Sequence, residues 1–255
     1  MVRAKKSLGQ NFLMHARIAE RIADVAHLTP EDAVLEIGPG TGMLTRAVLE
    51  RAGKVIAVEA DGELYAELGV TFADAIAAGR LTLAHCDIRD FDLDALPRGY
   101  RLVASIPYYL TGEIFRMFLE SEAQPRSMTL LVQKEVAERV ARSRKESLLS
   151  LSVKAYGAPK YEFTVPRGAF KPAPNVDSAV LSVCDISRAN FSTPEEERLF
   201  FALVRAGFAH KRKFLAKNLK EAGFLPLEVP EKARAEDLAL SDWIALVRSM
   251  RRADE

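Results

Sequence analysis

The chain has 255 residues, of which 49% are hydrophobic and 28% are charged, a composition that excludes wholesale disorder. Lysine and arginine together number 36 and aspartate and glutamate 35, so the bulk charge argues neither for nor against a nucleic-acid partner. Two distant cysteines, Cys86 and Cys184, argue against a zinc site or a disulfide framework and favour a reducing compartment. No apolar run approaches the ~20 residues of a membrane span, and we therefore expect a cytoplasmic protein without a metal.

Short apolar runs alternate with amphipathic stretches over the first half of the chain. Helical periodicity predicts helices at His15–Ala26, Met43–Arg51 and Gly112–Leu119. Buried strands are predicted at Ala33–Ile37, Val55–Val58, Leu81–Ala84, Arg101–Ala104 and Met128–Val132. Alternating and β-branched runs within Tyr161–Val183 complete the sheet. Strands that alternate with helices predict an α/β domain with a mainly parallel sheet.

From Thr193 onward the pattern is helical only. We predict helices at Glu195–Ala209, Lys211–Ala222 and Ala235–Met250, the first of them capped by Thr193 with Pro194 at its first position. The sequence therefore predicts two domains, an α/β domain over residues 1–186 and a small all-helical domain over residues 187–255.

Residues 201–220 contain no acid but hold six cations, namely Arg205, Lys211, Arg212, Lys213, Lys217 and Lys220. A basic cluster on an otherwise neutral chain is typical of a phosphate-binding surface. The alternative for any single cluster is a solvated helix face.

A glycine-rich turn, Gly38-Pro39-Gly40-Thr41-Gly42, follows the first strand and Glu36. Glycines let the backbone approach a ligand closely at the N-terminus of the next helix. Glu59 ends the second strand, where a carboxylate accepts hydrogen bonds from both ribose hydroxyls. Asp87 follows the third strand, where it can accept from an adenine amino group. The three features predict a nucleotide-type cofactor, and Met43 in place of a third glycine disfavours a nicotinamide.

Ser105-Ile106-Pro107-Tyr108 follows the fourth strand, at the edge where ligands bind in open α/β sheets. With the glycine turn, it resembles the Asn/Asp/Ser-x-Pro-aromatic motif of amino-methyltransferases that use S-adenosylmethionine. The exocyclic amine of adenine is a poor nucleophile because its lone pair is delocalised into the ring. Acceptors at Ser105 and at the carbonyl of Ile106 or Pro107 would take its two hydrogens and free that lone pair. Proline fixes the backbone, and Tyr108 offers a face for the base.

Long motifs along nearly the whole chain resemble one family, the KsgA-type rRNA adenine dimethyltransferases. These motifs are the segment 5–13 (Lys-Lys-Ser-Leu-Gly-Gln-Asn-Phe-Leu), the glycine turn with its strand-end acids, Ile106–Tyr109, and the segment 170–180 from Phe170 to Val180. The resemblance implies a Rossmann-like, S-adenosylmethionine-dependent methyltransferase domain followed by a small rRNA-binding domain. It also implies dimethylation of two adjacent adenosines in the 3′-terminal hairpin of 16S rRNA, late in assembly of the small ribosomal subunit, with S-adenosylhomocysteine as product. Nothing in the sequence indicates more than a monomer.

The resemblance also implies roles for single residues. Contacts with the cofactor are expected from Asn11, Leu13, Gly38, Gly40, Glu59, Asp87, Ile88 and Ser105. The catalytic set is Ser105, Ile106, Pro107, Tyr108 and Phe170, with Phe170 stacked on the target base opposite Tyr108. Contacts with rRNA are expected from Arg205, Lys211, Arg212 and Lys213.

Residue 105 departs from the family pattern, which normally has asparagine there. A serine hydroxyl is shorter than a carboxamide but still accepts a hydrogen bond, and other amino-methyltransferases have serine at this position. This departure leaves open a first alternative, in which the protein is an assembly factor with little catalytic activity. Methylation of large-subunit rRNA, as in the related resistance methylases, is a second alternative, which the segments 8–10 and 175–180 disfavour. A nicotinamide oxidoreductase is a third, disfavoured by Met43 and the Pro107-Tyr108 loop.

Overall fold

The computed structural model describes residues 5, 9–224 and 228–253, with side chains as far as Met250. Lys6, Ser7 and Leu8 of the N-terminal motif lie outside the described residues. The chain divides into two compact units, one of residues 1–137 and 159–186 and one of residues 138–158 and 187–255. No described helix is both long enough and apolar enough to cross a membrane.

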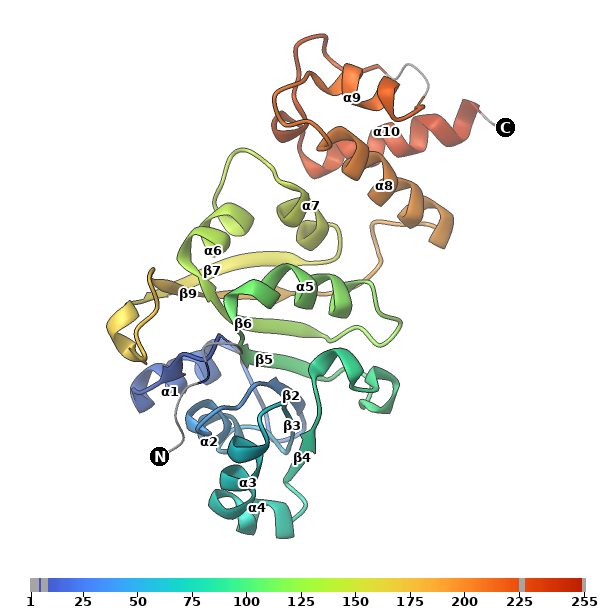
Figure 1. Cartoon of the computed structure of the whole chain (residues 1–255). Helices are drawn as coiled ribbons and strands as arrows, with labels where there is room; N and C mark the ends of the chain where they lie inside the picture. The colour runs from blue at the N-terminus through green and yellow to red at the C-terminus, as the bar shows by residue number, and fades with distance from the viewer. Residues whose placement is uncertain (1–4, 6–8, 225–227, 254–255) are drawn as a thin grey trace. The chain divides into compact units, whose positions relative to one another are not determined.

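The first unit is built on a seven-stranded sheet in the order β4-β3-β2-β5-β6-β9-β7 (Figure 1). The strands are β2 (Ala33–Ile37), β3 (Lys54–Glu59), β4 (Leu81–His85), β5 (Arg101–Ser105), β6 (Ser127–Gln133), β7 (Ala158–Val165) and β9 (Ser178–Cys184). Strands β2 to β6 are parallel, and β9 pairs antiparallel with β6. The predicted Rossmann-like α/β class is confirmed, and each predicted strand lies within one or two residues of its observed bounds.

Helices of the first unit cover a sheet that is apolar on both faces. They are α1 (Ala16–Val25), α2 (Met43–Leu49), α3 (Gly62–Thr71), α4 (Ala73–Ala77) and α5 (Thr111–Leu119), of which α3 and α4 were not predicted. Helices α1 and α2 pack together in a core with Val34, Val103 and Val180. The alternating residues Leu35 and Leu102 are equally buried and point to the opposite face. Burial on both faces explains why these strands appear in the sequence as continuous apolar runs.

The second unit contains α7 (Leu148–Lys154), α8 (Pro194–Gly207), α9 (Leu215–Glu221) and α10 (Leu240–Ala253), and α6 (Lys134–Ala141) crosses into it from the first. As predicted, Thr193 caps α8 with Pro194 at its start, and the Thr193 hydroxyl accepts a hydrogen bond from the Glu196 N–H. Phe200 and Phe201 are buried and pack edge to face. Trp243 is fully buried and stacks on Phe208 with ring centroids 6.1 Å apart.

The prediction that residues 1–186 form one domain differs from the structure at residues 138–158, which group with the second unit. Polar contacts explain the grouping. Asn190 Nδ2 donates to the Ala155 carbonyl at 2.8 Å, the Tyr156 hydroxyl donates to Glu197, and Lys145 pairs with Glu236. The residues in these pairs lie 35 to 91 positions apart, so no local pattern reveals them. The second unit is therefore more than the segment after residue 186.

Two predicted helices were too long. The helix predicted at Lys211–Ala222 begins at Leu215, because a turn ends at Lys213, whose N–H donates to the His210 carbonyl at 3.0 Å. Asn218 Nδ2 donates to the carbonyls of both Gly207 and His210 and so holds this turn against the end of α8. The helix predicted at Ala235–Met250 is divided into a short 3-10 helix, Ala235–Asp237, and α10.

Close packing of Gly207 on Trp243 leads to a stability prediction. A Cβ atom on Gly207 would lie 2.4 Å from a Trp243 ring carbon and 2.9 Å from Leu215 Cδ1. We expect Gly207→Ala to lower the free energy of unfolding by about 1–3 kcal/mol, because a fully buried ring has no room to move. Denaturant unfolding followed by fluorescence of Trp243, the single tryptophan, measures the change.

Gly69→Ala is the matched control, since Gly69 also lies inside a helix but has open space around its Cα. Removing a flexible glycine there is expected to raise stability by about 0.5–1 kcal/mol, measured by circular dichroism. Equal stabilisation by both substitutions would refute the packing argument.

Candidate functional site

Strand register brings the predicted cofactor and catalytic residues to one edge of the sheet. Ile37 of β2 pairs with Val58 of β3 and with Ala104 of β5. Gly38, Glu59 and Ser105, the residues that follow these three, therefore meet at the carboxyl ends of neighbouring strands. The crevice between β2 and β5 is where the strand order reverses, the usual ligand position in open α/β sheets.

The glycine turn adopts a conformation that other residues rarely take. Gly38, Gly40 and Gly42 have φ angles of +64°, +57° and +78°. A Cβ on Gly40 would approach Phe12 to 3.1 Å, and one on Gly42 would approach Phe72 to 2.5 Å. The backbone thus favours glycine at all three positions, and close neighbours add to this at Gly40 and Gly42.

Glu59 joins the turn to the end of β3. Its side chain is buried, and its carboxylate accepts from the Gly40 N–H at 3.1 Å and from the Asp61 N–H at 2.9 Å. Burial raises the pKa of Glu59, and these backbone hydrogen bonds oppose the rise. Each oxygen is held by one donor, which leaves acceptor capacity on both for a ligand with paired hydroxyls.

Glu36 lies deeper in the pocket and has no backbone donor of this kind. It is 1% exposed, and neither carboxylate oxygen has a hydrogen-bond partner among the described residues. Burial raises the pKa of Glu36 to about 8, the Thr45 hydroxyl opposes the rise, and the nearby Glu59 carboxylate adds to it. An unpartnered buried carboxyl in a ligand pocket fits a cationic ligand group, which would restore its ionised form.

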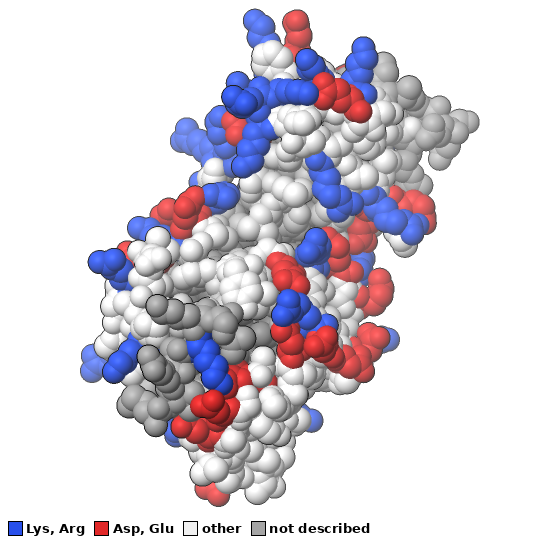
Figure 2. Space-filling view, in the orientation of Figure 1, with Lys and Arg blue, Asp and Glu red and all other residues white. Residues whose placement is uncertain are grey.

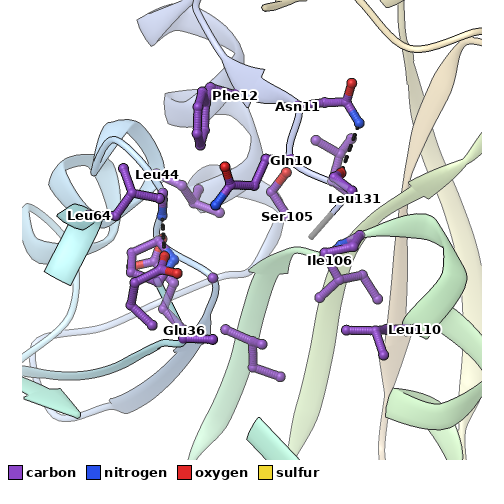
Figure 3. Close-up of a pocket in the computed structure, with 18 of the residues that line it drawn as sticks. Gln10, Asn11, Phe12, Glu36, Leu44, Leu64, Ser105, Ile106, Leu110 and Leu131 are labelled. Atoms are coloured by element: carbon purple, nitrogen blue, oxygen red, sulfur yellow. Dashed lines mark hydrogen bonds between the residues drawn. The ribbon is translucent and has the colours of Figure 1, made fainter. Parts of the chain in front are cut away.

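The N-terminal strap, residues 9–14, crosses the pocket and is anchored at Asp61. Gln10 Nε2 and Lys5 Nζ donate to the two Asp61 oxygens at 3.0 and 2.8 Å, and the Lys5 N–H donates to Gln10 Oε1 at 2.7 Å. Phe12 and Leu13 form β1, which pairs antiparallel with β8 (Phe170–Lys171). Figure 3 shows Phe12, Gln10 and Asn11 on one side of the pocket. The strap therefore connects the predicted cofactor residues Asn11 and Leu13 to Phe170.

Asp87 and Ile88 follow β4 at the pocket wall. Ile88 is buried, and Asp87 is paired with the exposed Arg89, whose Nη2 and Nε lie 2.6 and 2.9 Å from its oxygens. The Arg89 guanidinium lowers the pKa of Asp87, so this carboxylate is ionised. It can accept a further hydrogen bond from an adenine amine while Arg89 holds it.

The loop after β5 forms the opposite wall. The Pro107 carbonyl accepts from the Leu110 N–H at 3.0 Å, and the Tyr108 carbonyl accepts from the Thr111 hydroxyl at 3.0 Å. The Tyr108 hydroxyl lies 2.7 Å from Ser178 Oγ. Figure 3 shows Ser105 and Ile106 across the pocket from Glu36.

One pocket of about 1100 Å³, its open mouth included, contains every predicted cofactor and catalytic residue. They are Asn11, Leu13, Gly38, Gly40, Glu59, Asp87, Ile88, Ser105, Ile106, Pro107, Tyr108 and Phe170. The sequence analysis assigned no role to Glu36, Gln10 or Asp61. For Glu36 the signal was available, since an acid two residues before the first glycine is buried at the end of a parallel strand.

The residues predicted to bind RNA lie in the second unit. Arg205 is exposed in the last turn of α8, and Lys211 and Arg212 are exposed in the turn before α9. Lys213 is paired with Glu221, with the Nζ atom 2.7 Å from a carboxylate oxygen. Figure 2 shows Lys and Arg side chains gathered over the part of the molecule where Figure 1 places α8 and α9. Lys211 and Arg212 have no ion-pair partner among the described side chains, so they remain available for phosphates.

Glu36 leads to a prediction on pH dependence. Its ordinary pKa is 4.5 and its folded pKa is about 8, so between these values the folded protein keeps a proton that the unfolded chain has released. Raising the pH across this interval therefore lowers the free energy of unfolding, by about 1.4 kcal/mol per pH unit.

The Glu36→Gln variant lacks this ionisation and should not lose this stability. As the pH is raised across the same interval, its free energy of unfolding should therefore increase relative to that of the unsubstituted protein. Denaturant unfolding at a series of pH values measures the difference, and the other titrating groups cancel because both proteins contain them. Parallel stability curves would show that Glu36 is ionised in the folded protein.

Comparisons with known proteins identify the family of the chain. The family model described as ribosomal RNA adenine dimethylase matches residues 1–250. The chain is 40% identical to ribosomal RNA small subunit methyltransferase A of Dehalococcoides mccartyi strain 195, over 95% of this chain and 87% of that protein. It is 37% identical to the protein of the same name from Fusobacterium nucleatum, over 96% of each.

Solved structures have the same fold. A dimethyladenosine transferase from Plasmodium falciparum superposes with a TM-score of 0.79 at 23% identity, over 95% of this chain and 98% of that one. The 23S rRNA methyltransferase ErmE superposes with a TM-score of 0.76 at 24% identity, over 96% of this chain and all of that one. The family model and the curated relatives confirm the resemblance that the motifs indicated. The chain therefore belongs to the ribosomal RNA adenine dimethylase family and is a methyltransferase of that family.

Proposed function

We propose that this enzyme transfers methyl groups from S-adenosylmethionine to the exocyclic amines of two adjacent adenosines in the 3′-terminal hairpin of 16S rRNA. The observation that carries the proposal is the single pocket that joins the glycine turn and Glu59 to the Ser105–Tyr108 loop. The curated relatives are named for the small subunit, which supports that substrate over the large subunit.

The pocket fits the proposed cofactor group by group. Glu59 has acceptor capacity for the two ribose hydroxyls, and Asp87 with Ile88 offers an acceptor and an apolar wall to adenine. The unpartnered carboxyl of Glu36 suits a ligand that carries cations. When bound, S-adenosylmethionine supplies a methyl group on a sulfonium whose leaving group is neutral. Asn11 and Leu13 of the strap and Gly38 and Gly40 of the turn would close around it.

Catalysis would rest on two hydrogen-bond acceptors. Ser105 Oγ would accept one hydrogen of the adenine amine. The Ile106 carbonyl would accept the other, because the Pro107 carbonyl is already bonded to the Leu110 N–H. The nitrogen then becomes tetrahedral and its lone pair can form the new N–C bond. The same acceptors stabilise the positive charge that develops on the nitrogen before it loses a proton, so no strong base is needed.

The target adenosine must leave its stack to enter the pocket, which costs a few kcal/mol. Tyr108 and Phe170 would hold the extruded base between their rings. The rRNA phosphates would be bound by Arg205, Lys211 and Arg212. Lys213 would contribute less to phosphate binding, because it is already paired with Glu221. The proposal includes action as a monomer in the cytoplasm, late in subunit assembly, and the two free cysteines, Cys86 and Cys184, fit a reducing compartment.

The direct test of the proposed function is methylation of small subunits that lack these modifications, with labelled S-adenosylmethionine and mapping of modified nucleosides by mass spectrometry. We expect dimethyladenosine at two adjacent positions of the 3′ hairpin. We also expect Ser105→Asn to retain or raise turnover, because the longer carboxamide places an acceptor nearer the amine. A misplaced acceptor costs on the order of 100-fold, so the effect is measurable.

Three results would contradict this proposal in different ways. Product on large-subunit rRNA would identify the other substrate. Turnover by the Ser105→Asn variant alone, with subunit binding intact in both proteins, would indicate an assembly factor. A large loss of activity in Ser105→Asn would show that the loop is adapted to serine.

Charge reversal tests the RNA surface. Arg212→Glu should weaken binding of small subunits and lower the slope of log affinity against log salt by roughly one or more, because fewer counterions are released. Lys54→Glu is the matched control, since it makes the same change of charge at the exposed start of β3, the strand end away from the pocket. Binding assays over a range of salt concentrations measure both slopes. Equal slopes for the two variants would remove Arg212 from the interface.

A further inference from the structure

Two adjacent residues, Asp177 and Ser178 at the start of β9, make hydrogen bonds with the segment before Phe170 and with the Tyr108 side chain. Ser178 is fully buried, and its hydroxyl lies 2.7 Å from the Tyr108 hydroxyl. Asp177 Oδ1 accepts from the Arg167 N–H at 2.9 Å and so holds the short 3-10 helix Arg167–Ala169, which leads directly into Phe170. One dipeptide therefore contacts the segments that carry Tyr108 and Phe170.

The dipeptide itself is fixed by the sheet. Ser178 pairs with Gln133 in the antiparallel ladder between β9 and β6. The Asp177 carbonyl accepts from the Lys134 N–H at 3.0 Å. The backbone of both residues is thus held by the β6–β9 pairing, and it can serve as a fixed reference for the two rings.

The backbone near each ring is held by further hydrogen bonds. The Thr111 hydroxyl bonds the Tyr108 carbonyl, so the Ser178 hydroxyl fixes the far end of a side chain whose near end is already fixed. Phe170 pairs with Leu13 in the β1–β8 ladder, and the Met14 N–H donates to the Ala169 carbonyl at 2.9 Å. With the Asp177 bond on the other side, the Phe170 segment is held from both directions.

We propose that Asp177 and Ser178 are positioning residues that set the orientation of the Tyr108 and Phe170 rings for the target base. The inference rests on the proposed function, because it assigns these rings to an adenine. Neither Asp177 nor Ser178 lines the pocket, so neither touches the cofactor or the reacting amine. Their effect must pass through the rings, and it should leave binding of S-adenosylmethionine unchanged.

A double-mutant cycle tests the Ser178 half of the proposal. Ser178→Ala and Tyr108→Phe each remove the same hydrogen bond, and the second keeps the aromatic ring. We expect each to lower kcat on small subunits by roughly 10- to 100-fold, and the double variant to lose no more than either single one. Calorimetric affinity for S-adenosylmethionine should stay as in the unsubstituted enzyme.

Ser182→Ala is the matched control for Ser178→Ala. Ser182 is buried on the same strand and the same face, and its hydroxyl donates to Glu162 at 2.6 Å. Ser182→Ala should leave kcat unchanged even where it lowers stability as much as Ser178→Ala does. For the other ring, Asp177→Ala should lower kcat, and Asp177→Asn should restore it, because an amide oxygen still accepts from the Arg167 N–H.

A readout that needs no methyl transfer separates this inference from the proposed function. A 3′-hairpin RNA with 2-aminopurine at the target position should lose fluorescence on binding, as the base stacks on Tyr108 and Phe170. Ser178→Ala should weaken this quenching and Ser182→Ala should not.

Suppose that the unsubstituted enzyme methylates the rRNA. Additive losses of kcat in the double-mutant cycle, or equal losses of kcat in Ser178→Ala and Ser182→Ala, would then overturn the inference and leave the proposed function standing. Quenching that depends on Ser178, without methylation by any variant, would overturn the function and support the positioning role. No quenching by the unsubstituted protein would overturn the positioning role.

Discussion

Between β2 and β5 the winding of the sheet reverses, and the hydrogen-bond register of the parallel strands decides which residues meet there. Ile37 pairs with Val58 on one side and Ala104 on the other, so Gly38, Glu59 and Ser105 emerge together. A slip of one residue would turn Glu59 or Ser105 to the other face of its strand. The buried apolar runs oppose such a slip, because it would carry the polar residue at the end of a strand into the interior of the sheet.

This constraint explains which parts of the molecule could be predicted. Each strand of the parallel sheet is a short apolar run, so its end was visible in the sequence, and the residues at the ends followed. The anchors of the strap and of Tyr108 were not visible, because Gln10 reaches Asp61 over 51 positions and Tyr108 reaches Ser178 over 70. Contacts between polar side chains at such separations leave no periodic signal. The late start of α9 has a local cause, the two carbonyls held by Asn218.

Two carboxyl groups at the cofactor end of the pocket, Asp61 at its border and Glu36 inside it, have different surroundings and therefore different charges. Burial alone would raise the pKa of Asp61, but hydrogen bonds from Lys5, Gln10 and the Glu63 N–H hold it below the usual value. Asp61 therefore stays ionised and anchors the strap. Glu36 has neither a cation nor a backbone donor beside it, and burial keeps it protonated near neutral pH. The protein thus pairs Asp61 at the border of the pocket with Lys5. Glu36 inside the pocket has no such cation and could pair with a cationic group of the proposed ligand.

In the proposed reaction the acceptor loop would divide its work so that residue 105 has to supply only a hydrogen-bond acceptor. Of the groups that would hold the adenine, the Ile106 carbonyl belongs to the backbone, and the adjacent Pro107, with φ of −57°, restricts its direction. The Tyr108 ring is held at its carbonyl by Thr111 and at its hydroxyl by Ser178. Only the side-chain acceptor differs from the family pattern, and an oxygen is still present there. Because the backbone and the ring would orient the base in the proposed reaction, the acceptor at residue 105 would need to supply one lone pair rather than the geometry of the site.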